Sequence, residues 1–287
     1  MLNAQDNGPR DVFADINYFA ADGQVREVAS WRKRYLGVGD EHTRKMRVHD
    51  VRPFADHLTL DKNGFQFTKL SPKNRDTDDD ALIQTEYYKE VEELVKNMTG
   101  ADVVYVFNHA TRRASTNIIQ GVPDEKGQVP SGHPHVDYCG VPELMEGTKK
   151  ELSLPEEIKT LFDSSLRFSF INAWRPIQTA KRDPLALADA MTVPDSDYLV
   201  RARTFPSGIN AGNYVMSHGS QEQKHQWYYM PEMQPNDMVV FNGYDTKQDW
   251  PGWRCPHTAI VLPDTESLPP RQSIECRAVC FWNKSQS

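Results

Sequence analysis

Residues 165–174 read SLRFSFINAW. In this stretch apolar and polar side chains alternate with a period of two, which is the side-chain period of a β-strand. Strands with this pattern pack one face on a core. We therefore predict a strand whose buried face carries Leu166, Phe168, Phe170, Asn172 and Trp174, with Arg167 and Ser169 on the other face.

Similar short runs follow one another along the chain from residue 101 onward, separated by Gly, Pro, Asn and Asp. A series of many short strands after one long helix is typical of a β-sandwich or of a double-sheet barrel such as a jelly roll. We therefore predict a mainly β fold with flanking helices. The runs are ADVVYVFNH (101–109), HPHVDYC (133–139), DYLVRARTF (197–205), HQWYYMP (225–231), DMVVFNG (237–243), HTAIVLP (257–263) and SIECRAVCFW (273–282).

The clearest helix is predicted over residues 76–100. Acidic residues 78–80 suit the positive end of a helix dipole, apolar residues recur at helical spacing from Ile83 to Met98, and Gly100 is placed to end the helix. A second helical turn is predicted at SLPEEIKTLF (153–162), with Ser153 and Glu156 as a capping box. Residues 1–75 are interpreted as irregular structure with short strands that wrap a core.

Composition restricts the classes of function. The chain has 287 residues and a formal net charge of −7, which disfavours binding to nucleic acid or to an anionic membrane. Its four cysteines are too few for a disulfide scaffold and lack zinc-type spacing. The N-terminus lacks the pattern of a signal peptide, and no apolar run is long enough to span a bilayer. A cytoplasmic globular protein is therefore expected.

Residues 132–140 read GHPHVDYCG and supply the first candidate metal ligands. On a strand, His135 and Asp137 point to the same face. Two histidines and one carboxylate on one face, with open positions opposite, form the iron site of non-haem Fe(II) oxygenases. Such a pair is a weak signal by itself, because the third ligand must come from elsewhere in the chain.

Residues 255–282 strengthen this hypothesis. They read as two strands joined by a Pro-rich turn, with His257 opening the first strand and Arg271 and Ser273 opening the second. A guanidinium pairs with a carboxylate through two hydrogen bonds, and a hydroxyl satisfies a further lone pair. A His followed by Arg-x-Ser on the next strand is therefore the pattern expected where iron and 2-oxoglutarate bind together.

The sequence also resembles the Fe(II)/2-oxoglutarate-dependent hydroxylase/desaturase family that includes fungal gibberellin desaturase and the bacterial cephem methoxylase component. The resemblance covers roughly residues 100–285. It rests on HPHVDYC, FINAWRPI with PLALAD, HQWYYMPEM with DMVVFNGYDT, and PHTAIVLPD with PPRQSIECRAVCFW.

The resemblance implies a double-stranded β-helix (a jelly-roll, cupin-like core) with Fe(II) on His135, Asp137 and His257. It implies 2-oxoglutarate on Arg271 with Ser273, and O2 as the oxidant. The expected reaction is oxidation of an unactivated C–H bond by hydroxylation, desaturation or oxygen insertion. The expected substrate is a small molecule of secondary metabolism, with terpenoids and meroterpenoids as the first candidates.

Several assignments stay open from the residues. Arg277 has the same strand parity as Arg271, so it is a second candidate for 2-oxoglutarate or for an anionic part of the substrate. One interpretation places Asn172 or Arg175 at the co-substrate. The other places Arg175 in the core, where it forms a salt bridge. Tyr138 is a candidate substrate contact.

Two rival functions remain. A cupin-type metalloenzyme would use His133 and His135 without 2-oxoglutarate, and a metal-free barrel would bind a small molecule without catalysis. His225 is interpreted as a packed, hydrogen-bonded histidine. We expect a single oxygenase domain over 1–287, with 1–100 as the wrapping region and 101–287 as the jelly-roll core. The expected partner is a small-molecule substrate, without nucleic acid or membrane, and a homodimer is a further expectation.

Overall fold

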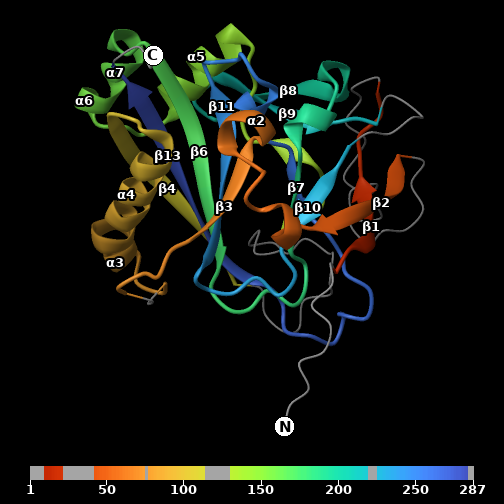
Figure 1. The fold of residues 1–287 in the computed structure, drawn as a ribbon. Coiled ribbons are helices and arrows are strands. Elements are labelled where there is room, and N and C mark those ends of the chain that lie inside the picture. The colour runs from red at the N-terminus through yellow and green to blue at the C-terminus, as the bar shows by residue number, and fades with distance from the viewer. Residues whose placement is uncertain (1–9, 22–41, 75–76, 114–129, 219–224, 284–287) are drawn as a thin grey trace.

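A computed structural model describes residues 10–21, 42–74, 77–113, 130–218 and 225–283, which form two β-sheets that face each other (Figure 1). One sheet has five strands in the order β3-β11-β6-β13-β4 and the other has eight in the order β1-β2-β10-β7-β12-β5-β9-β8. The predicted jelly-roll fold class is confirmed.

All neighbours in the five-stranded sheet are antiparallel. Its central strand β6 is buried on both faces from Phe168 to Pro176, so the prediction of one buried face is wrong. Phe170 and Trp174 face the other sheet, whereas the alternate residues pack beneath a helix on the outside. Leu166, expected on the buried face, precedes the strand and is 68% exposed. The strands are β3 (Phe65–Lys69), β11 (Asp237–Asp245), β6 (Arg167–Pro176), β13 (Gln272–Trp282) and β4 (Val103–Arg113).

The eight-stranded sheet is antiparallel except where β10 pairs with β2. The runs at 133–139 and 257–263 form strands of only two and three residues, and β7 and β9 were not among the predicted strands. The strands are β1 (Val12–Asn17), β2 (Thr43–Asp50), β10 (Trp227–Tyr229), β7 (Leu185–Ala188), β12 (His257–Ala259), β5 (His135–Val136), β9 (Asn210–Met216) and β8 (Tyr198–Thr204).

The long helix predicted over 76–100 is confirmed. It consists of α3 (Asp80–Leu82), a π-helical turn (Ile83–Tyr87) and α4 (Tyr88–Thr99). The Asp79 carboxylate accepts from two backbone N–H groups at its start, and Gly100 ends it in the left-handed region at a φ of 68°. This helix covers the outer face of the five-stranded sheet (Figure 1).

The other helices lie near one end of the two sheets. The capping box predicted at Ser153 is wrong, because the helix begins at Glu156 with Pro155 at its N-cap and no side-chain cap bond. The ten-residue helix Pro142–Glu151, which begins at a proline and precedes this turn, was not predicted. The helices are α2 (Leu60–Asn63), α5 (Pro142–Glu151), α6 (Glu156–Lys159) and α7 (Leu161–Ser164).

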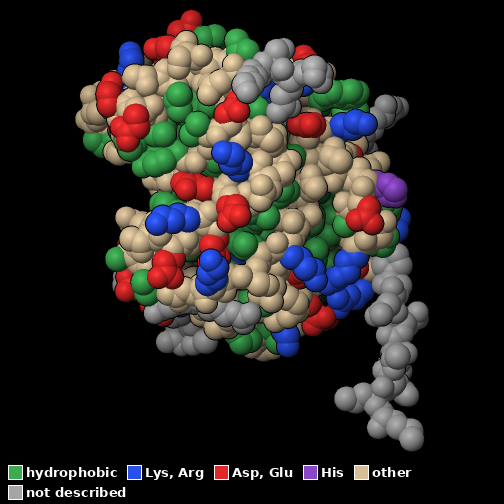
Figure 2. Space-filling view, turned by 60° about the vertical axis from the view of Figure 1, so that its left-hand side comes forward, with side chains coloured by type: hydrophobic (Ala, Val, Ile, Leu, Met, Phe, Trp, Pro, Cys, Tyr) green, Lys and Arg blue, Asp and Glu red, His purple; other side chains and the backbone are tan. Residues whose placement is uncertain are grey.

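The N-terminal part supplies short strands, as predicted. β1 and β2 pair antiparallel at the edge of the eight-stranded sheet, and β3 forms the edge of the other sheet. In the face drawn in Figure 2, acidic and basic side chains are interspersed among hydrophobic ones. Among the described residues, no helix is long and apolar enough to cross a membrane.

Candidate metal centre

Three candidate metal ligands lie together between the two sheets. The Nε2 atom of His135 lies 3.6 Å from Oδ1 of Asp137, and Nε2 of His257 lies 4.0 Å from the same oxygen. One ligand atom from each residue falls within 4.8 Å of the others. The arrangement follows from pairing, because β5 and β12 are adjacent and antiparallel with His135 directly opposite His257.

Both imidazoles are oriented by the backbone. The Nδ1 atom of His135 lies 2.8 Å from the carbonyl oxygen of His133, and Nδ1 of His257 lies 3.2 Å from that of Cys255. A carbonyl can only accept, so each Nδ1 carries the proton and each Nε2 keeps a lone pair toward the cluster. Burial, with His257 nearby, lowers the pKa of His135 to about 4, and burial also lowers the pKa of His257. Both rings are therefore neutral at pH 7, as metal binding requires.

One oxygen of the Asp137 carboxylate faces the two histidines, and the other accepts hydrogen bonds. Its Oδ2 accepts from Nδ2 of Asn172 at 2.6 Å and from Nε of Arg277 at 3.3 Å, while Oδ1 faces the two Nε2 atoms. Burial favours the neutral acid, but Arg277 and the two histidines hold the pKa of Asp137 below its usual range. Asp137 is thus an ionised candidate ligand whose Oδ1 faces the two histidines.

The residues behind Asp137 form a hydrogen-bonded network on the inner face of the five-stranded sheet. Oε1 of Glu275 accepts from Nδ2 of Asn172 at 3.1 Å and pairs with Nη2 of Arg277 at 2.6 Å. Arg277 and Asn172 are direct cross-strand partners on β13 and β6. Glu275 was missed in the sequence, although it shares the strand parity of Ser273 and Arg277 and could have been found by that rule.

This donor set fits a ferrous ion. Two neutral imidazole nitrogens and one carboxylate oxygen converge from one side, which matches the facial 2-His-1-carboxylate arrangement of non-haem iron. The atoms behind the ligands are hydrogen-bonded, as is usual for side chains that hold metal.

Comparisons with known proteins agree with this chemistry. A family model described as "Oxidoreductase/YMDC permease-like domain" matches residues 16–281. The chain is 33% identical to "Alpha-ketoglutarate-dependent dioxygenase phiK" from Fungal sp., over 94% of this chain and 96% of the relative. The chain belongs to the Fe(II)/2-oxoglutarate-dependent dioxygenase family.

Two further relatives support the same family. The dioxygenase resembles a solved structure, "iron and alpha-ketoglutarate-dependent endoperoxidase NvfI", with a TM-score of 0.69 and 27% identity over 84% of this chain and 87% of that one. It is 24% identical to "Gibberellin cluster GA4 desaturase" from Gibberella fujikuroi, over 82% of this chain and 86% of the relative. The predicted resemblance is confirmed. As a member of this family the dioxygenase is an enzyme that uses Fe(II), 2-oxoglutarate and O2, and the two rival functions are set aside.

The candidate 2-oxoglutarate residues of the dioxygenase lie at the start of β13. Arg271 is 5% exposed, its Nη1 donates to the carbonyl oxygen of Asp183 at 2.7 Å, and its guanidinium lies 5.0 Å from the Trp174 ring centre. Ser273 is buried and shares the inner face with Glu275 and Arg277. Arg277 follows Arg271 by six positions, about 20 Å along a strand, so Arg271 lies at the start of β13 and Arg277 near its middle.

Arg175 and Tyr138 lie in different places. Arg175 is on the outer face of β6, where its Nε donates to the Tyr87 hydroxyl at 2.9 Å beneath the long helix. The structure therefore does not bring Arg175 to the metal ligands. Among the described residues it forms no salt bridge, and its guanidinium donates to the Tyr87 hydroxyl and to the carbonyl oxygen of Pro235. Tyr138 stacks on Phe170 with ring centres 4.5 Å apart and lines a cavity beside Asp137.

Two cavities adjoin the metal centre of the dioxygenase. One of about 390 Å³ is lined by Asp137, Tyr138 and Arg277, with Phe107, Leu152, Arg203 and Phe205 among its other walls. The second, of about 240 Å³, is lined by His135, Asp137 and residues of β8 and β9. Asp137 thus lies between them. Part of the walls comes from β8, which lies in the predicted run 197–205, and from β9, which was not predicted.

The remaining histidines of interest have structural partners. His133 lies outside the ligand cluster, is 2% exposed, and its Nδ1 lies 3.0 Å from the carbonyl oxygen of Asn17. His225 is buried between the Tyr18 hydroxyl at 2.9 Å and the Asp197 carboxylate at 3.0 Å, which matches its interpretation as a packed histidine.

Proposed function

We propose that His135 and His257 through Nε2, and Asp137 through Oδ1, bind the Fe(II) of this dioxygenase. The proposal is carried by the convergence of these three atoms, each oriented by a hydrogen bond on its far side. When bound, iron with 2-oxoglutarate and O2 supplies the oxidising chemistry of the site.

Arg271 and Ser273 are the proposed partners of the distal 2-oxoglutarate carboxylate. Arg277 forms ion pairs with both Asp137 and Glu275, so its guanidinium positions the proposed metal ligand Asp137 instead of binding 2-oxoglutarate. Arg271 is buried at the start of β13 with the Trp174 ring beside it, and its Nη1 donates to the backbone carbonyl oxygen of Asp183. A planar guanidinium with a neighbouring hydroxyl suits a buried carboxylate.

The proposed substrate is a small molecule of secondary metabolism, with terpenoids and meroterpenoids first. The cavity walls Phe107, Tyr138 and Leu152 are apolar and would exclude water from its body. The relatives include a hydroxylase/desaturase, a gibberellin desaturase and an endoperoxidase, which supports hydroxylation, desaturation or oxygen insertion as the outcome. A single domain over 1–287, a homodimer and a cytoplasmic location stay predictions.

The test begins with binding. Isothermal titration of 2-oxoglutarate into Mn(II)-loaded protein should show saturable binding at one site, and Asp137→Ala should abolish it with loss of the metal. Asp163→Ala, which changes an exposed aspartate on α7, is the matched control. Succinate formation with Fe(II), O2 and a panel of terpenoids then seeks the substrate. Wild-type protein that binds metal but no 2-oxoglutarate would contradict the proposal.

A further inference from the structure

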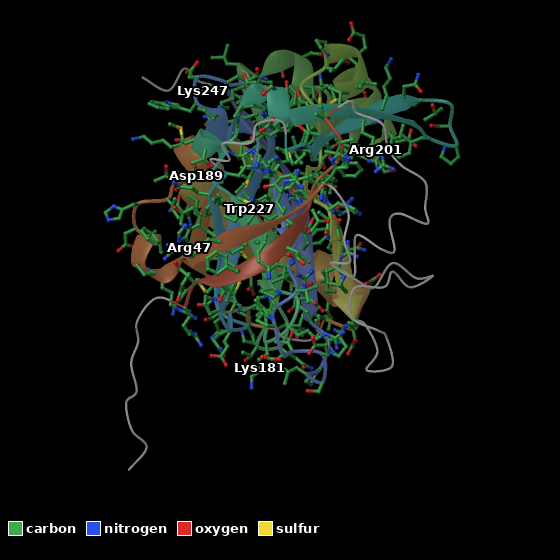
Figure 3. The ribbon with its side chains drawn as sticks, turned by 90° about the vertical axis from the view of Figure 1, so that its right-hand side faces the viewer. Arg47, Lys181, Asp189, Arg201, Trp227 and Lys247 are labelled. Atoms are coloured by element: carbon green, nitrogen blue, oxygen red, sulfur yellow. The ribbon has the colours of Figure 1, made fainter. Side chains whose placement is uncertain are left out.

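Two arginines on β8 face the metal centre and were not singled out in the sequence. Arg201 and Arg203 are two residues apart and point to the same side of the strand. They pair across the ladder with Asn213 and Ala211 of β9. Both line the cavity that contains His135 and Asp137, and Arg203 also lines the larger cavity beside Asp137. Figure 3 shows Arg201 next to β8, on the other side of the view from Arg47.

Among the described residues, the guanidinium groups of these arginines have no carboxylate partner within 4 Å. Within the part of the chain that the structure describes, neither Arg201 nor Arg203 forms an ion pair within 4 Å, and the Phe205 ring lies 5.0 Å from the Arg203 guanidinium. The nearby carboxylates Asp137 and Glu275 are bonded to Arg277 and Asn172, and Glu151, which also lines the larger cavity, accepts from the Ser207 hydroxyl. Arg201 is half-buried and Arg203 is exposed, so their guanidinium groups are free to pair with an anion that enters the cavity from solvent.

One part of the larger cavity is apolar, although Asn108, Thr148 and Glu151 also line it. Phe107, Tyr138, Leu152 and Phe205 contribute apolar surface around the same space in which Arg203 lies. A cavity with apolar walls and a few charged groups at one side fixes the orientation of an amphipathic ligand. The ligand that meets both conditions is a small apolar molecule that carries a carboxylate.

We propose that Arg201 and Arg203 bind a carboxylate of the primary substrate and so select apolar carboxylic acids for this dioxygenase. This inference rests on the proposed function in one respect, that Arg271 holds the carboxylate of 2-oxoglutarate. The guanidinium pair then orients the substrate from β8, across the metal ligands from β13. Arg201 and Arg203 are specificity residues for the substrate and take no part in metal binding.

The experiment compares a charged probe with a neutral one. Protein loaded with Zn(II) and 2-oxoglutarate is dialysed to equilibrium against 1-naphthylacetate and, separately, 1-naphthylacetamide. We expect the wild type to bind the acid at least about tenfold more tightly, as one charge-assisted pair implies. The double variant Arg201→Gln/Arg203→Gln should lose this preference, and Arg201→Lys/Arg203→Lys should keep part of it. Arg47→Gln, an exposed arginine on β2, should behave as the wild type.

The Kd of 2-oxoglutarate shows whether Arg201 and Arg203 bind the carboxylate of the substrate or that of 2-oxoglutarate. It should change by less than about twofold in the Gln double variant. A large loss of 2-oxoglutarate affinity there, with the probe preference intact, would assign the pair to the co-substrate and overturn the proposal. Equal binding of acid and amide by the wild type would also overturn it. A wild type that prefers the acid but binds no 2-oxoglutarate would support the pair and contradict the proposed function.

Discussion

Replacement of Asn172 by alanine tests how the metal centre is held together. Asn172 is fully buried, and its amide Nδ2 donates to Asp137 at 2.6 Å and to Glu275 at 3.1 Å. Its substitution removes both hydrogen bonds and leaves Arg277 as the remaining donor to Oδ2 of Asp137 among the described residues. The carboxylate is then free to rotate its Oδ1 away from the two histidines.

The size of the effect follows from these two bonds. A hydrogen bond to a charged group contributes about 1.5–3 kcal/mol. Removal of the groups that orient metal ligands typically weakens metal binding by about 10–100-fold. We therefore expect Asn172→Ala to raise the Kd of Fe(II), measured by anaerobic competition with a chelator, by about 10–100-fold.

Asn242→Ala is the matched control. Asn242 is a buried asparagine on the adjacent strand β11, and its Nδ2 also donates twice, to the carbonyl oxygens of Leu60 and Gly252. Its loss should lower the free energy of unfolding by about 1–3 kcal/mol and leave the Fe(II) affinity unchanged. If both variants weakened Fe(II) binding equally, or if neither did, the reasoning about Asp137 would be refuted.

Three further predictions concern other residues. Arg271→Gln should raise the Kd of 2-oxoglutarate by about 10–100-fold without changing Fe(II) affinity, and equal 2-oxoglutarate binding would exclude Arg271 as its partner. Arg175→Met removes the bond to Tyr87 and should lower the free energy of unfolding in urea by about 1–3 kcal/mol, with 2-oxoglutarate binding intact; a loss of that binding would return Arg175 to the site. Burial lowers the pKa of His225, although Asp197 acts in the opposite direction. Below the ordinary histidine pKa of about 6.5, His225 therefore binds a proton in the unfolded chain but stays neutral in the folded chain. Stability should therefore fall from pH 7 to pH 5 and fall less steeply in His225→Gln, whereas identical pH slopes would exclude this contribution.

Local patterns were sufficient for much of the fold and for the candidate ligands. The alternation around β6, the helical spacing before Gly100 and the His-x-Asp pair are all encoded within ten to twenty residues. His257 could be joined to His135 because Arg271 and Ser273 supplied a second, independent pattern. The structure places the three candidate ligands together through the pairing of β5 with β12.

The errors arose where a long-range partner decides the outcome. β6 looks amphipathic, but α4 covers its second face, and no local pattern shows that a distant helix will pack there. Arg175 differs from Trp174 by one position in sequence and therefore lies on the opposite face of the sheet. Arg201 and Arg203 lie in the predicted run 197–205, but their place beside the metal centre depends on strand β9, which pairs with β8 and was not predicted.

The most direct test of the proposed site is spectroscopic. Fe(II) and then 2-oxoglutarate are added to the protein without oxygen, and the visible absorption is searched for the weak charge-transfer band of a keto acid chelated to ferrous iron. The proposal predicts the band in the wild type, its absence in Asp137→Ala, and a requirement for more 2-oxoglutarate in Arg271→Gln. Iron binding without this band in the wild type, or an unchanged band in Asp137→Ala, would contradict it.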